Sequence, residues 1–250
     1  MYYTCMDLNI IFEDQNILIL NKPRGILVQQ DGDDTHLSLD KMVSDYLKST
    51  AMPVHRLDKD TSGLVVFAKN NNAADELGKA FADHEQIEKH YLTLVKGMEE
   101  RGGEIDAPLR KSYDRKKMVV APISSGAKEA ITEYRVIKDY KDYSLLDVML
   151  FTGRTHQIRA HMSYIRHHVV GDVKYGDYKV NNLFKREYGF ENQFLHSYKL
   201  KFLDIKGSLN YLKNKELALD YLTKLNILPN TRPEQISPEQ YLSLSKLLNV

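Results

Sequence analysis

The stretch that is most informative about this sequence is His55-Arg56-Leu57-Asp58-Lys59-Asp60-Thr61-Ser62-Gly63-Leu64, which runs directly into Val65-Val66-Phe67-Ala68-Lys69. It is a polar loop that meets a glycine and then enters a short apolar strand. Loops of this kind often carry function, because a rigid element holds their polar groups in place. Taken alone, the loop has a second interpretation, since two carboxylates among cations can also form a surface ion-pair loop.

On both sides of this stretch the apolar pattern predicts strands interrupted by a few helices. The spacing predicts helices over residues 38–47, with Ser38 as the cap, and over residues 71–83 and 155–165. Short apolar or alternating runs predict strands over residues 9–12, 17–21, 64–69, 91–96, 130–138, 143–150 and 194–202. Because helices separate only some of the strands, we expect an α+β fold with a mixed, largely antiparallel sheet and flanking helices.

From about Gly207 onward the pattern becomes helical. Leucines at 209, 212, 219, 222 and 225 share one helical face, and a break at residues 229–233 precedes a second helix capped by Ser237. We therefore expect residues 1–206 to form the main domain and residues 207–250 to form a helical C-terminal appendage.

The composition is that of an ordinary soluble protein, with 42% apolar and 28% charged residues among 250. Cys5 is the only cysteine, so an intrachain disulfide is excluded, which fits a reducing cytosol. The N-terminus lacks the basic and apolar segments of a signal peptide, and no apolar run is long enough to span a membrane. We expect a cytoplasmic monomer without a membrane partner.

The charge is divided unevenly along the chain, although the net charge is only +1. Residues 1–100 carry 10 Lys and Arg against 17 Asp and Glu, whereas residues 101–250 carry 25 against 17. The basic residues are densest over residues 110–117 and around Arg154, Arg159 and Arg166. A single charged run usually indicates a solvated face, but two basic clusters with Tyr and His between them favour a surface that binds a polyanion.

The loop at residues 55–64 resembles the HRLDxxTSG signature of the RluA family of RNA pseudouridine synthases, and further motifs follow in the family's order. The turn at residues 21–25 is similar to the family's K-P-x-G turn, and residues 89–97 resemble its K-x-Y-x-x-x-V-x-G strand. Residues 153–161 resemble GRTHQIRxH, and residues 117–118, 126, 132–134, 171–176 and 195–197 fit its remaining markers. The resemblance covers residues 9–203, and it implies that residues 1–206 form a catalytic domain with the pseudouridine synthase fold.

The resemblance implies three catalytic residues. Asp58 matches the family's catalytic aspartate, and a carboxylate can act as a nucleophile without a metal or a cofactor. Arg159 matches the arginine that pairs with this aspartate, and an arginine about 4 Å away contributes on the order of 4 kcal/mol at an intermediate dielectric. Tyr91 matches the active-site tyrosine that lies against the target uracil. Attack on the uracil ring, attack on C1′ and assistance of glycal formation all remain open as routes for Asp58.

The resemblance also implies residues that bind the substrate. Ile158 is expected to form an apolar wall opposite Tyr91, whereas packing in the core is the usual role of such a residue. Arg56 is expected to fill the space that a uridine leaves when it is flipped out of a stem, a step that costs a few kcal/mol. His55, beside it, and Arg154 are expected to contact the substrate, the latter by orienting the loop or binding phosphate. The expected partner is ribosomal or transfer RNA, and the expected activity isomerises one uridine to pseudouridine.

Two functions from other classes remain possible on the sequence alone. Asp58 and Asp60 form the D-x-D pattern of aspartate-nucleophile phosphatases, although no apolar strand precedes them. A non-catalytic RNA-binding protein that has retained the fold is the second alternative. No His and Cys spacing fits a metal site, since residues 84–88 lack the second histidine of the zinc-protease motif and His156 and His161 are five residues apart.

Two features differ from the wider family. Motifs that begin near residue 9 leave no room for the small N-terminal RNA-binding domain of many members. Residues 225–241 faintly resemble the C-terminal helical segment of ribosomal RNA adenine dimethyltransferases. We therefore expect the basic segment at residues 101–128 and the tail to help position the RNA.

Overall fold

The computed structural model describes residues 8–30, 37–97, 101–114, 116–140 and 142–219. Its helices are α1 (Leu39–Leu47), α2 (Asn71–Ala82), α3 (Gln157–Tyr164) and α4 (Tyr178–Tyr188), with short 3-10 helices η1 (Ile123–Ser125) and η2 (Gly207–Leu212). Its strands are β1 (Ile10–Glu13), β2 (Ile17–Lys22), β3 (Met52–Pro53), β4 (Ser62–Ala68), β5 (Ile87–Lys96), β6 (Gly102–Asp106), β7 (Leu109–Lys111), β8 (Met118–Val120), β9 (Ile131–Asp139), β10 (Tyr143–Leu150), β11 (Leu195–Phe202) and β12 (Glu216–Ala218).

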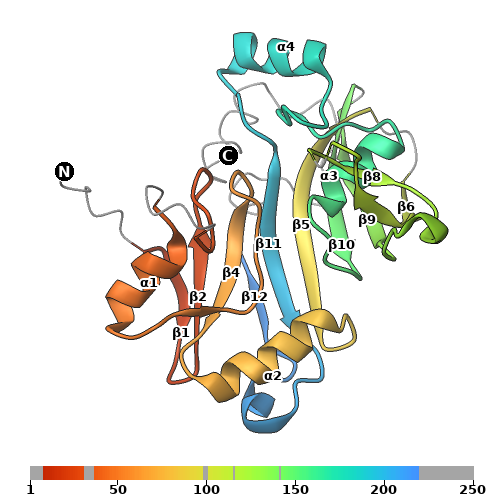
Figure 1. The fold of residues 1–250 in the computed structure, drawn as a ribbon. Coiled ribbons are helices and arrows are strands. Elements are labelled where there is room, and N and C mark those ends of the chain that lie inside the picture. Colours follow the sequence, from red (N-terminus) through yellow and green to blue (C-terminus); the bar gives the residue numbers. More distant parts are fainter. Residues whose placement is uncertain (1–7, 31–36, 98–100, 115, 141, 220–250) are drawn as a thin grey trace.

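The strands form one long mixed sheet, whose main path runs β1-β2-β4-β11-β5-β10-β9-β6. Among the described strands, β4 and β11 are the one parallel pair in this sheet, and the other neighbours are antiparallel. Strands β7 and β8 form a separate antiparallel hairpin. Helix α2 crosses one end of the sheet and α4 lies at the opposite end (Figure 1). The expected α+β fold with a largely antiparallel mixed sheet is confirmed.

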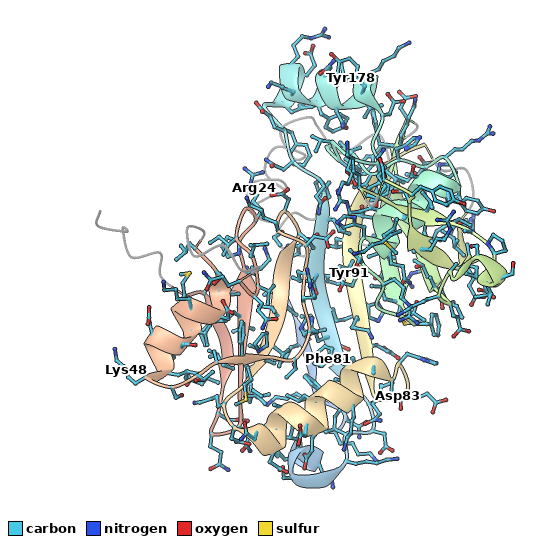
Figure 2. The ribbon with its side chains drawn as sticks, viewed as in Figure 1. Arg24, Lys48, Phe81, Asp83, Tyr91 and Tyr178 are labelled. Carbon is cyan, nitrogen blue, oxygen red and sulfur yellow. The ribbon has the colours of Figure 1, made fainter. Side chains whose placement is uncertain are left out.

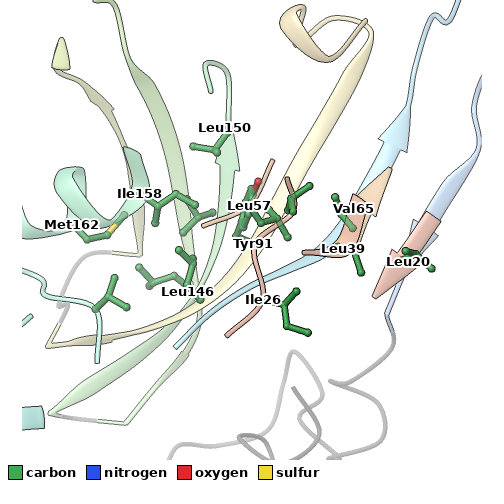
Figure 3. Packing of buried hydrophobic residues seen from close by; sticks show 14 of the residues in the cluster. Leu20, Ile26, Leu39, Leu57, Val65, Tyr91, Leu146, Leu150, Ile158 and Met162 are labelled. Atoms are coloured by element: carbon green, nitrogen blue, oxygen red, sulfur yellow. The ribbon is translucent and has the colours of Figure 1, made fainter. Parts of the chain in front are cut away.

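Strand β4 carries the sheet's core on both of its faces, which explains its continuous apolar sequence. Alternate residues of a strand point to opposite faces. Leu64, Val66 and Ala68 accordingly pack with α2, while Val65 and Phe67 pack in the cluster that extends toward α3. That second cluster includes Leu57 and Tyr91, so it passes directly beneath the polar loop at residues 55–61 (Figure 3).

Gly63 sets the contact between β4 and β11. Its φ is +110°, and it pairs with Ser197 in the parallel register. A Cβ atom here would lie 2.1 Å from the Ser197 carbonyl oxygen, so a side chain would force the two backbones apart. The glycine therefore allows the loop before β4 to lie beside β11, next to the middle of β5, where Tyr91 is located (Figure 2).

Residues 207–219, the described part of the helical appendage expected over residues 207–250, do not form an α-helix. Residues 207–212 form the 3-10 helix η2, and residues 216–218 form β12, which pairs with β11. Leu209 and Leu212 are fully buried in the α2 cluster, because their spacing of three residues fits a 3-10 turn as well as an α-helix. Residues 207–218 therefore belong to the sheet and core of the main domain. The rest of the predicted appendage, residues 220–250, lies outside the described residues.

Smaller differences concern helix ends and one missed helix. Ser38 stands at the N-cap of α1, but its hydroxyl makes no capping hydrogen bond. Helix α4 was not predicted, although Asp177 accepts from the backbone N–H groups of Lys179 and Val180 and Gly189 ends the helix at φ +63°. These are ordinary start and stop signals. Within the described residues, no helix is both long enough and apolar enough to cross a membrane.

Candidate active site

One pocket of about 330 Å³ contains every site residue that the sequence predicted. It lies between the loop before β4, the C-terminal end of α2, β5 and the start of α3. Its walls include the predicted catalytic residues Asp58, Tyr91 and Arg159 and the predicted substrate-binding residues His55, Arg56, Arg154 and Ile158. Four chain segments that are remote in the sequence therefore meet around one cavity of a size that suits a small ligand or a single nucleotide base.

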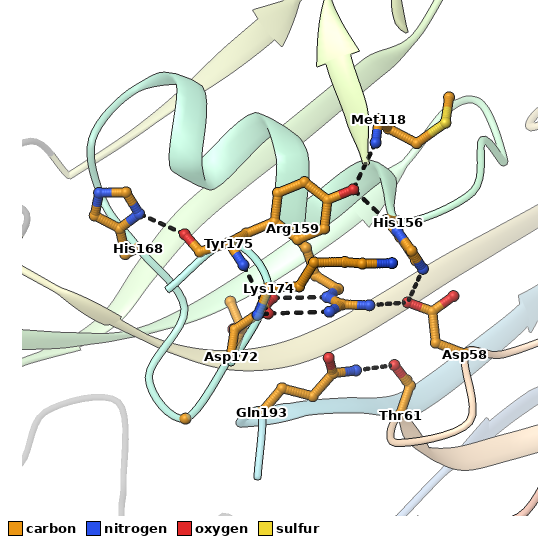
Figure 4. Close-up of polar contacts among 12 residues, drawn as sticks. Asp58, Thr61, Met118, His156, Arg159, His168, Asp172, Lys174, Tyr175 and Gln193 are labelled. Carbon is orange, nitrogen blue, oxygen red and sulfur yellow. Dashed lines mark hydrogen bonds and ion pairs between the residues drawn. The ribbon is translucent and has the colours of Figure 1, made fainter. Parts of the chain in front are cut away.

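At the centre of the pocket, the Arg159 guanidinium bridges two carboxylates (Figure 4). Its Nη1 donates to Asp58 Oδ2 at 2.8 Å. Its Nε and Nη2 donate to the two oxygens of Asp172 at 2.7 and 3.0 Å. The bidentate contact with Asp172 fixes the plane of the guanidinium, so Nη1 is aimed at Asp58.

The charges in this triad stabilise one another although Arg159 and Asp172 are buried, at 7% and 1% exposed. Burial alone would lower the pKa of Arg159, but the hydrogen bonds and charges of Asp172 and Asp58 outweigh it and raise the pKa above its ordinary value. Burial would raise the pKa of Asp172, and the Arg159 guanidinium instead holds that pKa below its usual range. The backbone N–H groups of Lys174 and Tyr175 also donate to Asp172 and contribute to this.

The loop that carries Asp58 is fixed by groups from three other segments. The buried ammonium of Lys22 donates to three carbonyl oxygens, including that of Lys59 at 2.9 Å. The same Lys59 oxygen accepts from the Gly25 N–H. The Thr61 hydroxyl accepts from the Gln193 side-chain amide at 2.7 Å. The chain that directly follows Asp58 is therefore fixed at Lys59 and at Thr61.

The start of α3 is organised by the side chain of Gln157. Its Oε1 accepts from the Arg154 backbone N–H and from the Thr152 hydroxyl, and its Nε2 donates to Ile131 O and to the Thr132 hydroxyl. This amide therefore ties the loop before α3 to β9. Arg159 lies two residues further along the same helix, so the network fixes the position from which it reaches Asp58.

A second polar chain approaches Asp58 through Tyr175 and His156. The Tyr175 hydroxyl accepts from the Met118 N–H at 2.7 Å and lies 3.0 Å from His156 Nδ1. His156 Nε2 lies 3.9 Å from Asp58 Oδ2. Burial lowers the pKa of His156, so the imidazole is neutral near pH 7.

Tyr91 and Ile158 form the apolar part of the pocket. They are 7% and 3% exposed and belong to the same buried cluster. Burial raises the pKa of the Tyr91 phenol, and the nearby Asp58 charge raises it further, so the phenol keeps its proton at physiological pH. The pocket therefore offers a flat apolar surface beside a carboxylate, which suits a nucleobase.

The other three predicted residues line the pocket in different ways. Arg56 is exposed, and its guanidinium can reach a bound polymer. The Arg154 Nε donates to the Glu129 carbonyl oxygen, which anchors that side chain at the rim. His55 stacks on Phe81 with 4.2 Å between ring centroids, and its Nε2 accepts from the Val66 N–H. His55 thus fastens the loop to α2 and β4 in addition to lining the pocket.

Four residues that shape the site were not predicted to do so. Asp172, Tyr175 and Gln193 hold the residues described above, and Lys89 lines the pocket with its ammonium bonded to the Phe81 carbonyl oxygen. Asp172 and Tyr175 lie in the stretch Gly171–Gly176, which matched a family marker without a role. An aspartate between two glycines, followed by a tyrosine, was the available signal for a second carboxylate.

Comparison with known proteins agrees with the fold. The family model for RNA pseudouridylate synthase matches residues 16–164. Ribosomal large subunit pseudouridine synthase D of Zymomonas mobilis is 39% identical over 207 residues, which cover 78% of this chain and 65% of that protein. The tRNA pseudouridine synthase C of Vibrio cholerae is 33% identical over 209 residues, covering 78% of this chain and 85% of that protein.

Two solved human structures share the architecture. RNA Pseudouridylate Synthase Domain Containing 4 superposes with a TM-score of 0.70 at 22% identity, covering 96% of this chain and 92% of that chain. RNA Pseudouridylate Synthase Domain Containing 1 superposes with a TM-score of 0.66 at 25% identity, covering 93% and 99%. The fold is that of the pseudouridine synthases. The chain belongs to the RNA pseudouridylate synthase family and, within it, to the RluA type.

Membership of this family leaves the phosphatase alternative without support. Asp58 and Asp60 lie within the residues that the family model matches, and Asp58 contacts Arg159 while Asp60 is exposed. The second alternative is an RNA-binding protein without activity. Only a measurement of turnover distinguishes it from an enzyme.

Proposed function

We propose that this protein isomerises a uridine to pseudouridine in ribosomal or transfer RNA, with Asp58 as the nucleophile. The observation that supports this most strongly is the Asp58–Arg159 contact of 2.8 Å in a pocket that also contains Tyr91. The printed names of the relatives include both a ribosomal and a transfer RNA enzyme, so both substrate classes remain candidates.

The reaction requires no co-reactant, because it only exchanges bonds within one nucleotide. The bond from N1 to C1′ breaks, a bond from C5 to C1′ forms, the proton on C5 leaves, and N1 is protonated by the end. Asp58 supplies the carboxylate that attacks or stabilises the separated fragment, and Arg159 keeps that carboxylate charged and aimed. Tyr91 and Ile158 hold the free uracil between them while it turns.

A uridine within a stem reaches this pocket only after it leaves the base stack. We assign Arg56 to that step, since its exposed side chain borders the pocket and can fill the vacated position. His55 and Arg154 border the same opening and contact the flipped nucleotide or its phosphate.

The base-flipping role predicts that Arg56→Ala is sensitive to RNA structure. The variant should lose activity mainly on a target uridine in a stem, because flipping from a relaxed single strand costs little. Turnover of matched stem and single-stranded substrates measures this, with Arg159→Ala as the comparison that should be impaired on both. An equal loss on both substrates for Arg56→Ala would remove it from the flipping step.

The proposed activity is tested by mapping pseudouridines in cells with and without the protein. One or a few sites in ribosomal or transfer RNA should disappear in the deletion strain. The purified protein should restore them in the extracted RNA, with EDTA present and no cofactor added. If no site is lost and the purified protein modifies neither RNA fraction, the activity is refuted and the RNA-binding alternative remains.

A further inference from the structure

The β7–β8 hairpin carries an exposed aromatic ring beside the candidate active site. Tyr113, in the turn between the two strands, is 93% exposed, the most exposed large hydrophobic residue in the described part of the chain. The guanidinium of Arg110 lies over one face of this ring, 4.4 Å from its centroid. The other face is open to solvent and can accept a flat partner.

The turn that holds Tyr113 is well defined. The Ser112 N–H donates to the Lys117 carbonyl oxygen, and the Ser112 hydroxyl accepts from the Lys117 N–H. Asp114 accepts from the Ser112 hydroxyl and from the Lys116 N–H, and the hydrogen bond from Ser112 holds the pKa of Asp114 below its ordinary value. The carboxylate of Asp114, the one acidic group described in the turn, thus forms hydrogen bonds within the turn.

The charges around the ring favour an anionic polymer. Arg110, Lys111, Lys116 and Lys117 all belong to this hairpin, against Asp114 alone among its described residues. An aromatic ring on a basic turn is the arrangement with which proteins bind unpaired nucleobases.

The hairpin is connected to Arg159 through the side chain of Tyr175. The Met118 N–H of β8 donates to the Tyr175 hydroxyl, and Lys117 Nζ lies 5.6 Å from the centroid of the same ring. Tyr175 in turn lies beneath the Arg159 guanidinium, at 5.1 Å. Leu109, Met118 and Val120 pack with Tyr175 in one cluster, so the hairpin is held at a fixed position relative to the pocket.

We propose that Tyr113, backed by Arg110, is a stacking platform for an unpaired base of the substrate RNA near the target uridine. The inference rests on the proposed function for its ligand, and it makes Tyr113 a residue that selects RNA in which such a base is available. Because the platform binds the RNA and not the reacting uracil, it acts on affinity and leaves the chemical step unchanged.

The absence of tryptophan from the whole sequence allows a direct measurement of stacking. Tyr113→Trp introduces a single fluorophore at the platform, and Tyr178→Trp introduces one at another exposed position, 78% exposed at the start of helix α4 (Figure 2). Both variants are titrated with ribosomal RNA and, separately, transfer RNA extracted from cells that lack the protein. Quenching that saturates for Tyr113→Trp with one RNA, and is absent for Tyr178→Trp, is the expected result. Equal quenching of both, or of neither, overturns the platform.

Turnover gives the second readout. Tyr113→Ala should raise KM about fivefold to a hundredfold with kcat unchanged, while Tyr113→Phe should stay close to wild type. Tyr178→Ala should change neither constant. Wild-type KM in Tyr113→Ala refutes the platform while the enzyme activity stands. Saturable quenching of Tyr113→Trp in a protein that forms no pseudouridine supports the platform while the proposed function fails.

Discussion

At the residue scale, the guanidinium of Arg159 is shared between Asp172 and Asp58, and the two contacts differ in kind. Asp172 is almost fully buried and accepts two hydrogen bonds from Arg159, whereas Asp58 faces the pocket and accepts one from Arg159. Asp172 therefore acts as a positioning residue, which keeps Arg159 charged and correctly oriented when Asp58 engages the substrate.

Asp172→Asn should lower kcat about tenfold to a hundredfold with little change in KM, because Arg159 loses its fixed orientation. Breaking a buried ion pair should also cost about 3–5 kcal/mol of stability. Steady-state kinetics and urea unfolding measure the two effects. Asp177→Asn, which removes the exposed ion pair with Lys96 and keeps an N-cap side chain on α4, is the control and should reduce stability slightly with kcat unchanged. A wild-type kcat in Asp172→Asn would contradict the positioning role.

The residues of the pocket show how much of the candidate site could be predicted from the sequence. Asp58, Tyr91 and Arg159 were found because each lies in a distinctive motif, and the structure brings all three to one pocket. Asp172 and Gln193 were missed as site residues, because their importance arises only from the tertiary contacts with Arg159 and Thr61. A buried aspartate is recognisable as a partner only when the arginine beside it is known.

At the scale of elements, strands were predicted well where the chain is apolar on both faces or alternates strictly. Strand β10 has the predicted bounds, and β4 and β11 differ by one or two residues. The hairpin β7–β8 and strand β6 were missed because all three strands are short and β6 and β7 also contain charged residues. The 3-10 helix η2 was mistaken for an α-helix because Leu209 and Leu212, three residues apart, fit either kind of helix. Strand β12 was included in that helix because its pairing with β11 is not visible locally.

The corrected structure of residues 207–218 predicts different effects for two truncations. Ending the chain after Lys206 removes the buried Leu209 and Leu212 and the strand β12, so the melting temperature should fall sharply or the protein should aggregate. Ending the chain after Leu219 keeps these elements and should be far less damaging. Thermal unfolding of both truncated chains measures this. An unchanged melting temperature in the shorter chain would show that η2 and β12 add nothing to the core.

At the scale of the whole molecule, the buried His196 and the half-buried His55 connect stability to pH. Burial lowers the pKa of His196 to about 3 and, with a contribution from the Lys89 charge, that of His55 to about 3. His55 also accepts from the Val66 N–H and so loses a bond when protonated. In the unfolded chain both histidines titrate near pH 6.5.

Because the folded pKa values lie below the unfolded ones, the unfolded state binds protons first as the pH falls. The contribution of these two histidines to stability should therefore be constant above about pH 6.5 and decrease below it, by about 1.4 kcal/mol per pH unit for each histidine. Urea unfolding between about pH 6 and pH 5, before most carboxylates titrate, measures the combined slope of the histidines with lowered pKa values, and a variant of one histidine then isolates its share. His55→Gln keeps an acceptor for Val66 and should make the slope shallower by the contribution of one histidine. A slope equal to that of the wild type would contradict a neutral, half-buried His55.

The account as a whole depends on a single carboxylate, and a matched pair of variants tests it most directly. Asp58 and Asp60 lie two residues apart in the same loop, but Asp58 contacts Arg159 in the pocket while Asp60 is exposed. The measurement is pseudouridine formation under single-turnover conditions, with RNA from cells that lack the protein and with the variants Asp58→Asn and Asp60→Asn. Asp60→Asn should react at close to the wild-type rate, and Asp58→Asn should form no pseudouridine while its RNA affinity and melting temperature stay near those of the wild type. Activity in Asp58→Asn above about one per cent of wild type would contradict the assignment of Asp58 as the nucleophile.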